Sequence, residues 1–449
     1  MLIAKIVLGL FGLGIVVFFH ELGHFLAARL VGINVEAFSI GWGKPLLKKK
    51  IGSCEYRIGM FPLGGYCKMR GESDYSNEAY KKLEEGILPE KGSYLAASPQ
   101  ARILVSFAGP FFNLLLAVLL LSVYWGIGFE VNTFDNKIIL LSEIESGQIF
   151  PADIAGLQTG DRILKVGKIK TDYFHEIRKN VALNPKKQLH LTIERNGEVL
   201  HTQITPSLQK KTGAGQIGIL FWADPVVGQV LGDSPAQKAG LERGDKIISV
   251  NGEAVFNQAD FQKIRSLNPD GLVLEYERGF HRGYIDLSGE DISGEIGFSW
   301  QTVNYRTPSL SVPAAIITGF KEGYETLIIS VRSLKVLFMG IDLTEAVSGP
   351  VRITYMMGEV AAQGFKHGTA TDIINFISLI SIALCVMNLL PLPILDGGMI
   401  ILFLVEMIRK KPIPPKAIAV FQTCGMVIIF GLLIFALYGD ILFVAKGGH

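Results

Sequence analysis

Residues 20–24 read His-Glu-Leu-Gly-His, an arrangement that can bind and use a metal ion. Histidines four residues apart lie on one face of a helix, so His20 and His24 can share a metal. Glu21 would lie beside a metal-bound water and could take its proton. Ionisable side chains in an apolar run are costly unless they are paired or bind metal. We therefore predict a zinc site with Glu21 as general base. Histidines that only cap a helix at the membrane interface are the alternative.

A catalytic zinc site needs a third protein ligand and an open position for water. Asp396 is the strongest candidate, because it follows an uncharged apolar run and stands among prolines and glycines that break a helix. An acid in irregular backbone at membrane depth is a functional residue by default. Four other histidines fall in a middle region that we expect to fold outside the membrane: His175, His190, His201 and His281. Spacing alone does not prove that Asp396 is a ligand.

Four apolar stretches are long enough to cross a bilayer as helices, which takes about 20 residues each. They comprise residues 1–30, 103–129, 373–395 and 417–439. Hydrophobic residues make up 49% of the chain, which indicates a membrane protein. A formal net charge of +2 argues against a nucleic-acid partner. A cleaved signal peptide is the rival interpretation of the first stretch, but its removal would take residues 20–24 with it.

Positive charges predict the orientation in the membrane. Lysines and arginines gather between the first and second apolar stretches and again between the third and fourth. By the positive-inside rule both connections lie in the cytoplasm. The termini and residues 130–369 are then expected outside, and that middle region is long enough to form separate domains.

The middle region contains an internal repeat. The pattern Pro-Ala-x-x-Ala-Gly-Leu-x-x-Gly-Asp occurs at residues 151–161 and again at 235–245. It resembles the core of a PDZ domain, which binds an extended chain by adding it to a sheet edge. Two further segments, 217–219 and 296–298, recur at a similar interval and are candidates for peptide-facing strands. Two generic β-rich modules are the alternative.

Residues 313–338 show apolar side chains at helical spacing with too many charges for a membrane span. The pattern predicts an amphipathic helix on the outer membrane surface. A helix packed on the PDZ domains is an equally open alternative.

Together these motifs resemble the site-2 protease family of intramembrane zinc metalloproteases, in its bacterial branch of the regulator of sigma-E protease type. The resemblance includes Asn-x-x-Pro at 388–391, Leu-Asp-Gly at 395–397, Ala-Gly-Pro at 108–110 with Asn113, and Pro-Leu-Gly-Gly-Tyr at 62–66. It implies one Zn²⁺ held by His20, His24 and Asp396, with Glu21 as general base. It also implies that substrate is bound by Asn388, Asn113, Gly64 and Gly65, the glycines lying in a membrane-associated β-hairpin at 37–69.

Two features depart from the family pattern. Ala383 stands where a second asparagine is expected before Asn388, which puts substrate binding by that position in doubt. The charged loop 72–100 has no assigned role.

The expected fold is an α-helical polytopic membrane protein of four transmembrane helices, with the hairpin and two extracytoplasmic α+β PDZ domains. The predicted order is transmembrane helix 1 (1–31), hairpin region and charged loop (32–100), transmembrane helix 2 (101–129), PDZ domains (130–212 and 213–306), amphipathic helix (307–345), transmembrane helix 3 with Leu-Asp-Gly (346–410), and transmembrane helix 4 with the C-terminus (411–449).

The resemblance implies a protease of the bacterial inner membrane, with the PDZ domains and both termini periplasmic and the active site toward the cytoplasm. Its partners would be the lipid bilayer and single-span substrates trimmed by an earlier protease, such as an anti-sigma factor in an envelope stress response or remnant signal peptides. Two alternatives remain open at this point. One is a membrane-anchored protease that cuts outside the bilayer, and the other is a PDZ scaffold with a vestigial zinc site.

Overall fold

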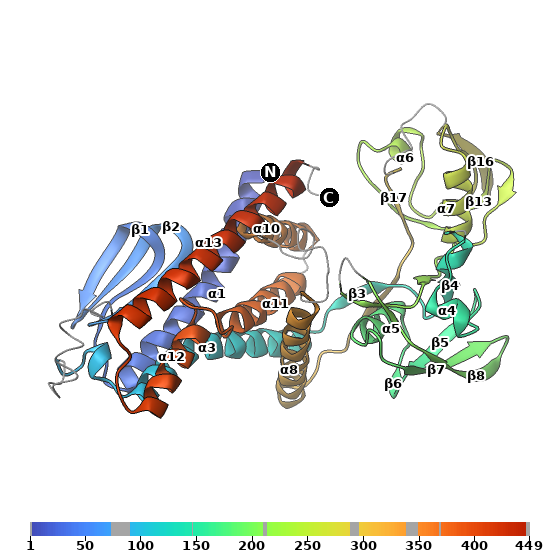
Figure 1. Ribbon diagram of the computed structural model, residues 1–449. Coiled ribbons are helices and arrows are strands. Elements are labelled where there is room, and N and C mark those ends of the chain that lie inside the picture. The colour runs from blue at the N-terminus through green and yellow to red at the C-terminus, as the bar shows by residue number, and fades with distance from the viewer. Residues whose placement is uncertain are drawn as a thin grey trace. The chain divides into compact units, whose positions relative to one another are not determined.

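The computed structural model describes residues 2–72, 90–145, 147–209, 213–287, 296–337, 349–367 and 370–445. The chain forms two compact units (Figure 1). The first combines residues 1–129 with 308–449, and the second comprises residues 130–307. Most of the charged loop 72–100 and the predicted boundary at 345 lie outside the described residues.

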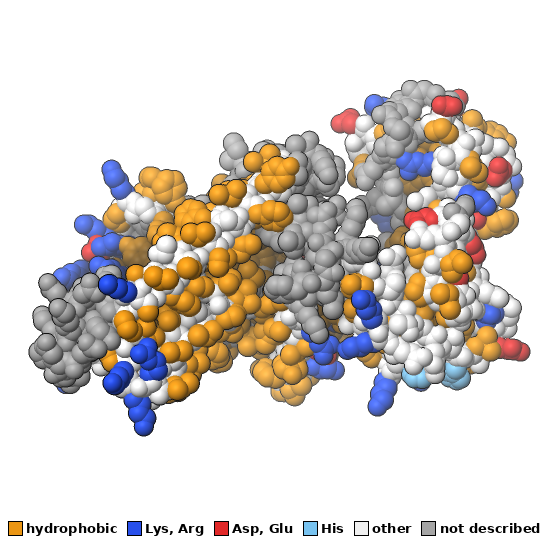
Figure 2. Space-filling view, in the orientation of Figure 1, with side chains coloured by type: hydrophobic (Ala, Val, Ile, Leu, Met, Phe, Trp, Pro, Cys, Tyr) orange, Lys and Arg blue, Asp and Glu red, His pale blue; other side chains and the backbone are white. Residues whose placement is uncertain are grey.

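Four helices of the first unit are long and apolar enough to cross a membrane. They are α1 (Leu2–Leu30), α3 (Pro99–Ile127), α11 (Ala370–Asn388) and α13 (Pro415–Ala445). Figure 2 shows hydrophobic side chains covering the visible face of α13. Val427 and Phe430 are among the exposed residues of this helix. A helix that exposes apolar side chains so widely is suited to lipid rather than water. The chain is therefore a multi-pass membrane protein.

The third apolar stretch does not form one continuous helix. The predicted segment 346–410 contains α10 (Pro350–His367), α11 and α12 (Asp396–Arg409). The backbone leaves α11 after Asn388 and restarts as α12 at Asp396, because the intervening prolines lack the N–H that a helix needs. This break places Asp396 at the first position of a helix. Ile394 in the break has φ +79°, an unusual conformation for a β-branched residue.

Helix α3 is the centre of the first unit, because α1, α8, α11 and α12 all pack against it. Helix α8 (Val312–Leu337) lies lengthwise along α3. Gly319 of α8 faces Ser122 and Gly323 faces Val118, so the two helices approach closely over successive turns. The predicted amphipathic helix is thus packed along a spanning helix, an arrangement that differs from one lying apart on the membrane surface.

The segment after α1 forms a small sheet from two long bent strands, β1 (Val35–Ile51) and β2 (Cys54–Met69). Residues 37–40 lie between residues 55–58 on one side and 65–68 on the other, while residues 45–51 pair with 54–59. The predicted hairpin therefore doubles back on itself, with residues 65–69 at one edge. The sheet packs on α1 through a cluster that includes Phe25 and Phe38. A short turn, η1 (Tyr94–Ala96), precedes α3.

The second unit contains two modules with the same order of elements, which correspond to the sequence repeat. The first module comprises β4 (Ile138–Leu140), α4 (Pro151–Ile154), β5 (Arg162–Val166), β6 (Ile169–Lys170), α5 (Phe174–Ala182), β7 (Leu189–Arg195), β8 (Glu198–Ile204) and β11 (Ile219–Phe221). The second comprises β12 (Val227–Val230), α6 (Pro235–Lys238), β13 (Lys246–Val250), β14 (Glu253–Ala254), α7 (Gln258–Leu267), β15 (Val273–Arg278), β16 (His281–Asp286) and β17 (Phe298–Trp300).

The sheet orders of the two modules match strand for strand: β6-β5-β7-β8 in the first and β14-β13-β15-β16 in the second. The strand pairs β4–β11 and β12–β17 correspond in the same way. Because β11 pairs with β4, the first module extends to Phe221, past the predicted boundary at 212. The candidate peptide-facing segments fall here, with Ile219 in β11 and Phe298 in β17.

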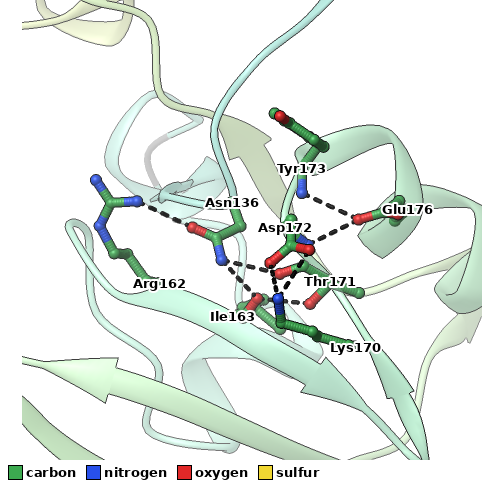
Figure 3. A network of polar contacts seen from close by, with 8 residues as sticks. All are labelled: Asn136, Arg162, Ile163, Lys170, Thr171, Asp172, Tyr173 and Glu176. Carbon is green, nitrogen blue, oxygen red and sulfur yellow. Dashed lines mark hydrogen bonds and ion pairs between the residues drawn. The ribbon is translucent and has the colours of Figure 1, made fainter. Parts of the chain in front are cut away.

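Smaller elements complete the second unit. Strands β3 (Glu130–Thr133) and β18 (Val303–Arg306) pair and bring its two ends together. The turn η2 (Leu141–Glu143) and the pair β9 (Ser207–Leu208) and β10 (Gly215–Gln216) belong to the first module. Figure 3 shows Asn136 in that module, where its amide donates to the carbonyls of Ile163 and Thr171. These bonds hold the approach to β4 against β5.

An ion pair between an arginine and a buried aspartate also repeats in the two modules. The Arg195 guanidinium donates two hydrogen bonds to Asp161 at 2.7 and 2.8 Å, and Arg278 makes the equivalent pair with Asp245 at 2.6 and 2.7 Å. Each aspartate also accepts a backbone N–H at the turn before it. The aspartate of the repeated Gly-Asp motif therefore fixes the turn between the short helix and the following strand.

Candidate active site

Three metal-ligating side chains from two distant parts of the sequence converge in the first unit. His20 and His24 come from α1, and Asp396 is the first residue of α12. The two Nε2 atoms lie 3.2 Å apart, and the Asp396 carboxylate oxygens lie 3.3 Å from His20 Nε2 and 3.5 Å from His24 Nε2. Among the described residues this is the one cluster of at least three such groups that could hold a metal ion.

The spacing of these atoms fits a tetrahedral zinc ion. Zinc ligands at about 2.0–2.1 Å from the metal lie about 3.3 Å from one another in a tetrahedron. The three observed separations are close to that value. Two imidazoles and one carboxylate leave a fourth position for water, which is the donor set of a catalytic zinc site. The side chains are 11–18% exposed, so the centre is largely enclosed.

Helix α3 supports both imidazoles through residues spaced four apart. The Val105 carbonyl oxygen lies 2.8 Å from His24 Nδ1, and the Asn113 amide lies 3.3 Å from His20 Nδ1. Gly109 stands between them, where a Cβ would come within 2.4 Å of His24 Nε2 and 2.8 Å of the His20 ring. Gly109 thus leaves the space that the two rings occupy.

A second glycine lets α1 approach α3. A Cβ on Gly23 would lie 2.3 Å from the Ala108 carbonyl oxygen, so the two backbones are nearly in contact. The Ala-Gly-Pro motif enters the sequence analysis only as part of the resemblance, so the support that the two imidazoles receive from Val105 and Gly109 was missed. Their four-residue spacing before Asn113 was the available signal.

Glu21 lies between the metal-binding cluster and the edge of the sheet. The backbone N–H of Cys67 donates a hydrogen bond to its carboxylate. Gly65 is also close, because a Cβ there would come within 3.2 Å of Glu21 Cγ. The edge strand of the hairpin therefore runs past the predicted general base.

The other predicted substrate-binding residues occupy different places. The Asn388 amide nitrogen lies 3.5 Å from His20 Nε2, on the side of the ring that faces the cluster. Gly64 has φ +81° and faces the Trp42 indole, not Glu21. Asn113 is fully buried behind His20. Ala383 is exposed on α11. The four middle-region histidines belong to the second unit and contribute nothing to this cluster.

An H-E-x-x-H helix and a distant aspartate that meet among membrane-spanning helices define a membrane-embedded zinc metalloprotease. The family model described as peptidase family M50 matches residues 8–432, and the chain belongs to this family, that of the site-2 proteases. It is 36% identical to a protein of Treponema pallidum (strain Nichols) over 98% of this chain and 99% of the relative. A Borreliella burgdorferi protein is 31% identical over 96% of each chain. Both relatives carry the name "Putative zinc metalloprotease".

Proposed function

We propose that this protein hydrolyses peptide bonds within the transmembrane segments of single-span membrane proteins. The observation that carries the proposal is the position of Glu21, which stands beside the His20, His24 and Asp396 cluster and under an open sheet edge. All of these groups belong to the unit that contains the four candidate spans.

The residues divide the chemistry among them. His20, His24 and Asp396 would hold the zinc ion. Bound zinc supplies a nucleophilic water at neutral pH, because it lowers the pKa of that water to about 7. Glu21 would act as the general base that takes a proton from that water, and could return the proton to the leaving amine. Asn388, beside the cluster, offers a polar contact to the substrate backbone.

A substrate helix must unwind before its carbonyls can be attacked, because a helix hides them in hydrogen bonds. Residues 65–69 have strand partners on one side only within the described part of the chain. An unwound substrate segment can add to this edge as a further strand. The strand would then pass Glu21, because the Cys67 N–H and Gly65 already border that carboxylate.

The second unit would control which proteins reach the site. Its two modules have the repeated motif that resembles PDZ domains, and we propose that they exclude membrane proteins with a bulky outer domain. Substrates would then be proteins already trimmed outside, such as an anti-sigma factor of an envelope stress response or remnant signal peptides. Deletion of residues 130–306 should release cleavage of untrimmed substrates, and untrimmed substrates that stay intact would refute the filter.

The proposed location is the bacterial inner membrane, with the second unit and both termini in the periplasm. Lysines and arginines gather where α12 ends and α13 begins, as Figure 2 shows at the end of the apolar face. The positive-inside rule places that connection in the cytoplasm. His24 lies near the end of α1 that leads into the basic segment 44–50, which supports a site on the cytoplasmic side.

The test compares Asp396→Ala with Asp372→Ala, an exposed aspartate in the first turn of α11. Zinc content and cleavage of a trimmed single-span reporter are measured on the purified proteins, and the cut is located by mass spectrometry. Asp396→Ala should lose zinc and activity, Asp372→Ala should keep both, and the cut should lie within the apolar segment. Zinc retained by Asp396→Ala, or a cut outside that segment, would favour a protease that acts on loops beyond the bilayer.

A further inference from the structure

We propose that Asn113 is a positioning residue that fixes the tautomer of His20, so that His20 presents an unprotonated Nε2 to the metal. The inference rests on the proposed zinc site and assigns to Asn113 a role other than substrate binding. Its starting point is a polar atom without a partner. The Asn113 side chain is fully buried, and its Oδ1 has no hydrogen-bond partner among the described residues.

In the present orientation of the Asn113 amide, its nitrogen, which is a donor, faces His20. Asn113 Nδ2 lies 3.3 Å from His20 Nδ1. An amide N–H that donates to Nδ1 requires the ring proton to be on Nε2. That Nε2 lies 3.2 Å from His24 Nε2 and 3.3 Å from Asp396, which is where the metal would be. A protonated Nε2 has no lone pair to give to a metal.

Rotating the amide by 180° turns its acceptor toward His20 and moves Nδ2 to the position that Oδ1 now occupies. The two ends of an amide have nearly the same shape, so the rotation exchanges Oδ1 and Nδ2 without moving the rest of the side chain. Oδ1 then accepts a hydrogen bond from His20 Nδ1–H and is no longer without a partner. His20 Nε2 is left with its lone pair directed at His24 and Asp396.

His24 has a similar partner at its Nδ1, but this partner is a backbone carbonyl, which cannot exchange an acceptor for a donor by rotation. Its Nδ1 lies 2.8 Å from the Val105 carbonyl oxygen, which only accepts. The His24 Nδ1 therefore carries the proton and its Nε2 is free for a metal. Helix α3 thus supplies one acceptor to each imidazole, through the backbone for His24 and through the Asn113 side chain for His20. Of these two acceptors, only the Asn113 side chain can be removed by mutation.

The surroundings of Asn113 favour a positioning role over contact with a substrate. Ser381 of α11 donates its hydroxyl to the backbone carbonyl oxygen of Asn113 at 2.7 Å, which ties this turn of α3 to α11. Asn113 is enclosed on α3 behind the His20 ring, whereas Asn388 lies at the ring edge that faces the cluster. A side chain with no exposed surface reaches the substrate only through His20.

The experiment compares the zinc affinity of wild type, Asn113→Leu and Asn113→Asp in the purified full-length protein, by competition with a chelator. Partners that orient metal-binding histidines typically contribute 10–100-fold to metal affinity. Leucine has a similar size and no acceptor, so Asn113→Leu should weaken zinc binding by about 10–100-fold. Aspartate can accept the Nδ1 proton, so Asn113→Asp should lose less than the about tenfold that marks removal of an orienting partner.

Other roles for Asn113 predict a different ranking of zinc affinity among wild type, Asn113→Leu and Asn113→Asp. If Asn113 only fills space, Asn113→Leu keeps its affinity and Asn113→Asp, which buries a charge, loses more; that order overturns the proposal. If Asn113 binds substrate, both variants keep their zinc affinity and only KM rises, which also overturns it. Thermal unfolding in detergent shows whether Asn113→Leu is folded. If it is not folded, the test rests on Asn113→Asp, and a zinc affinity of that variant far below that of wild type overturns the proposal.

A failure of the zinc site itself would be recognised separately. His20→Ala should abolish tight zinc binding if the proposed ligands are right. If His20→Ala binds zinc as wild type does, the metal site is wrong and the role of Asn113 falls with it. If His20→Ala fails to bind while Asn113→Leu binds normally, the metal site stands and only the role of Asn113 is refuted.

Discussion

Gly65 of the sheet edge lies against Glu21 of α1, with no room for a side chain between the hairpin and the helix. A Cβ at position 65 would stand 3.2 Å from Glu21 Cγ and 2.7 Å from the Ser39 carbonyl oxygen. Gly65→Ala should therefore displace the edge strand from the predicted base. We expect kcat/KM for a single-span reporter to fall at least about tenfold, since a misplacement of about 1 Å can cost about 100-fold. Zinc content should not change.

The control for Gly65→Ala is Gly431→Ala in α13, because a Cβ at residue 431 meets no atom within 4 Å. That variant should keep full activity. Equal activity of Gly65→Ala and wild type would show that the edge strand does not act with Glu21.

Gly109 offers a test of the metal centre that changes no ligand. Gly109→Ala would place a methyl group 2.4 Å from His24 Nε2, so the two rings must move apart or rotate. We expect zinc affinity to fall by about 10–100-fold, as when a partner of a metal ligand is disturbed. Gly126→Ala on the same helix is the control, because its Cβ would make an ordinary 3.7 Å contact with Ala315. Similar zinc affinities in the two variants would contradict the observed packing.

A buried ion pair holds α12 in register with α3. Arg102 donates to Glu406 at 2.6 Å, and its guanidinium lies 4.8 Å from the Phe403 ring centre. Glu406→Ala leaves Arg102 buried without its partner, which should cost about 3–5 kcal/mol of stability. Because α12 begins at Asp396, zinc affinity should fall as well. Thermal unfolding and zinc titration in detergent check both effects.

The control for that pair is Glu55→Ala, which breaks the more exposed Arg57–Glu55 ion pair of the hairpin. Surface pairs often contribute nothing measurable, so its unfolding temperature should not change. A Glu406→Ala variant with unchanged stability and zinc affinity would show that contacts other than the Arg102–Glu406 pair position α12.

The repeated ion pair should matter equally in both outer modules. Arg278→Ala leaves the fully buried Asp245 carboxylate without its main partner, and we expect a loss of about 3 kcal/mol in the free energy of unfolding of residues 130–307. Arg195→Ala should act similarly through Asp161. Chemical denaturation of the 130–307 fragment measures both losses. Arg282→Ala is the control, because its partner Glu277 is far less buried than Asp245. An equally large loss in this variant would contradict the argument.

Local signals in the sequence pointed to candidate metal ligands, and the resemblance to the site-2 proteases implied the full set of three. Four-residue spacing placed His20 and His24 on one helix face, and the prolines around residue 391 predicted the break that leaves Asp396 at a helix start. The repeated Gly-Asp motifs predicted two similar modules, and the structure has them. The PDZ identity of these modules and the roles of the site residues stay predictions.

Other features depend on contacts that no local pattern encodes. Apolar spacing in α8 predicted an amphipathic helix, but spacing alone does not tell a helix lying on a membrane from one packed along α3. Gly109 has no side chain, so its importance appears only once the rings of His20 and His24 lie beside it. The order of strands in the hairpin depends on how residues 37–40 insert between two parts of β2.

The central claim is that Glu21 works with a metal held by His20, His24 and Asp396 to cut a peptide within the membrane. The most direct measurement is cleavage of a single-span reporter without its outer domain by purified wild type and Glu21→Gln in detergent, with zinc content determined for both. We predict equal zinc content, cleavage inside the apolar segment by wild type that a zinc chelator stops, and a rate at least about 100-fold lower for Glu21→Gln. Cleavage by Glu21→Gln at the wild-type rate, or cleavage that persists in the chelator, would contradict the account.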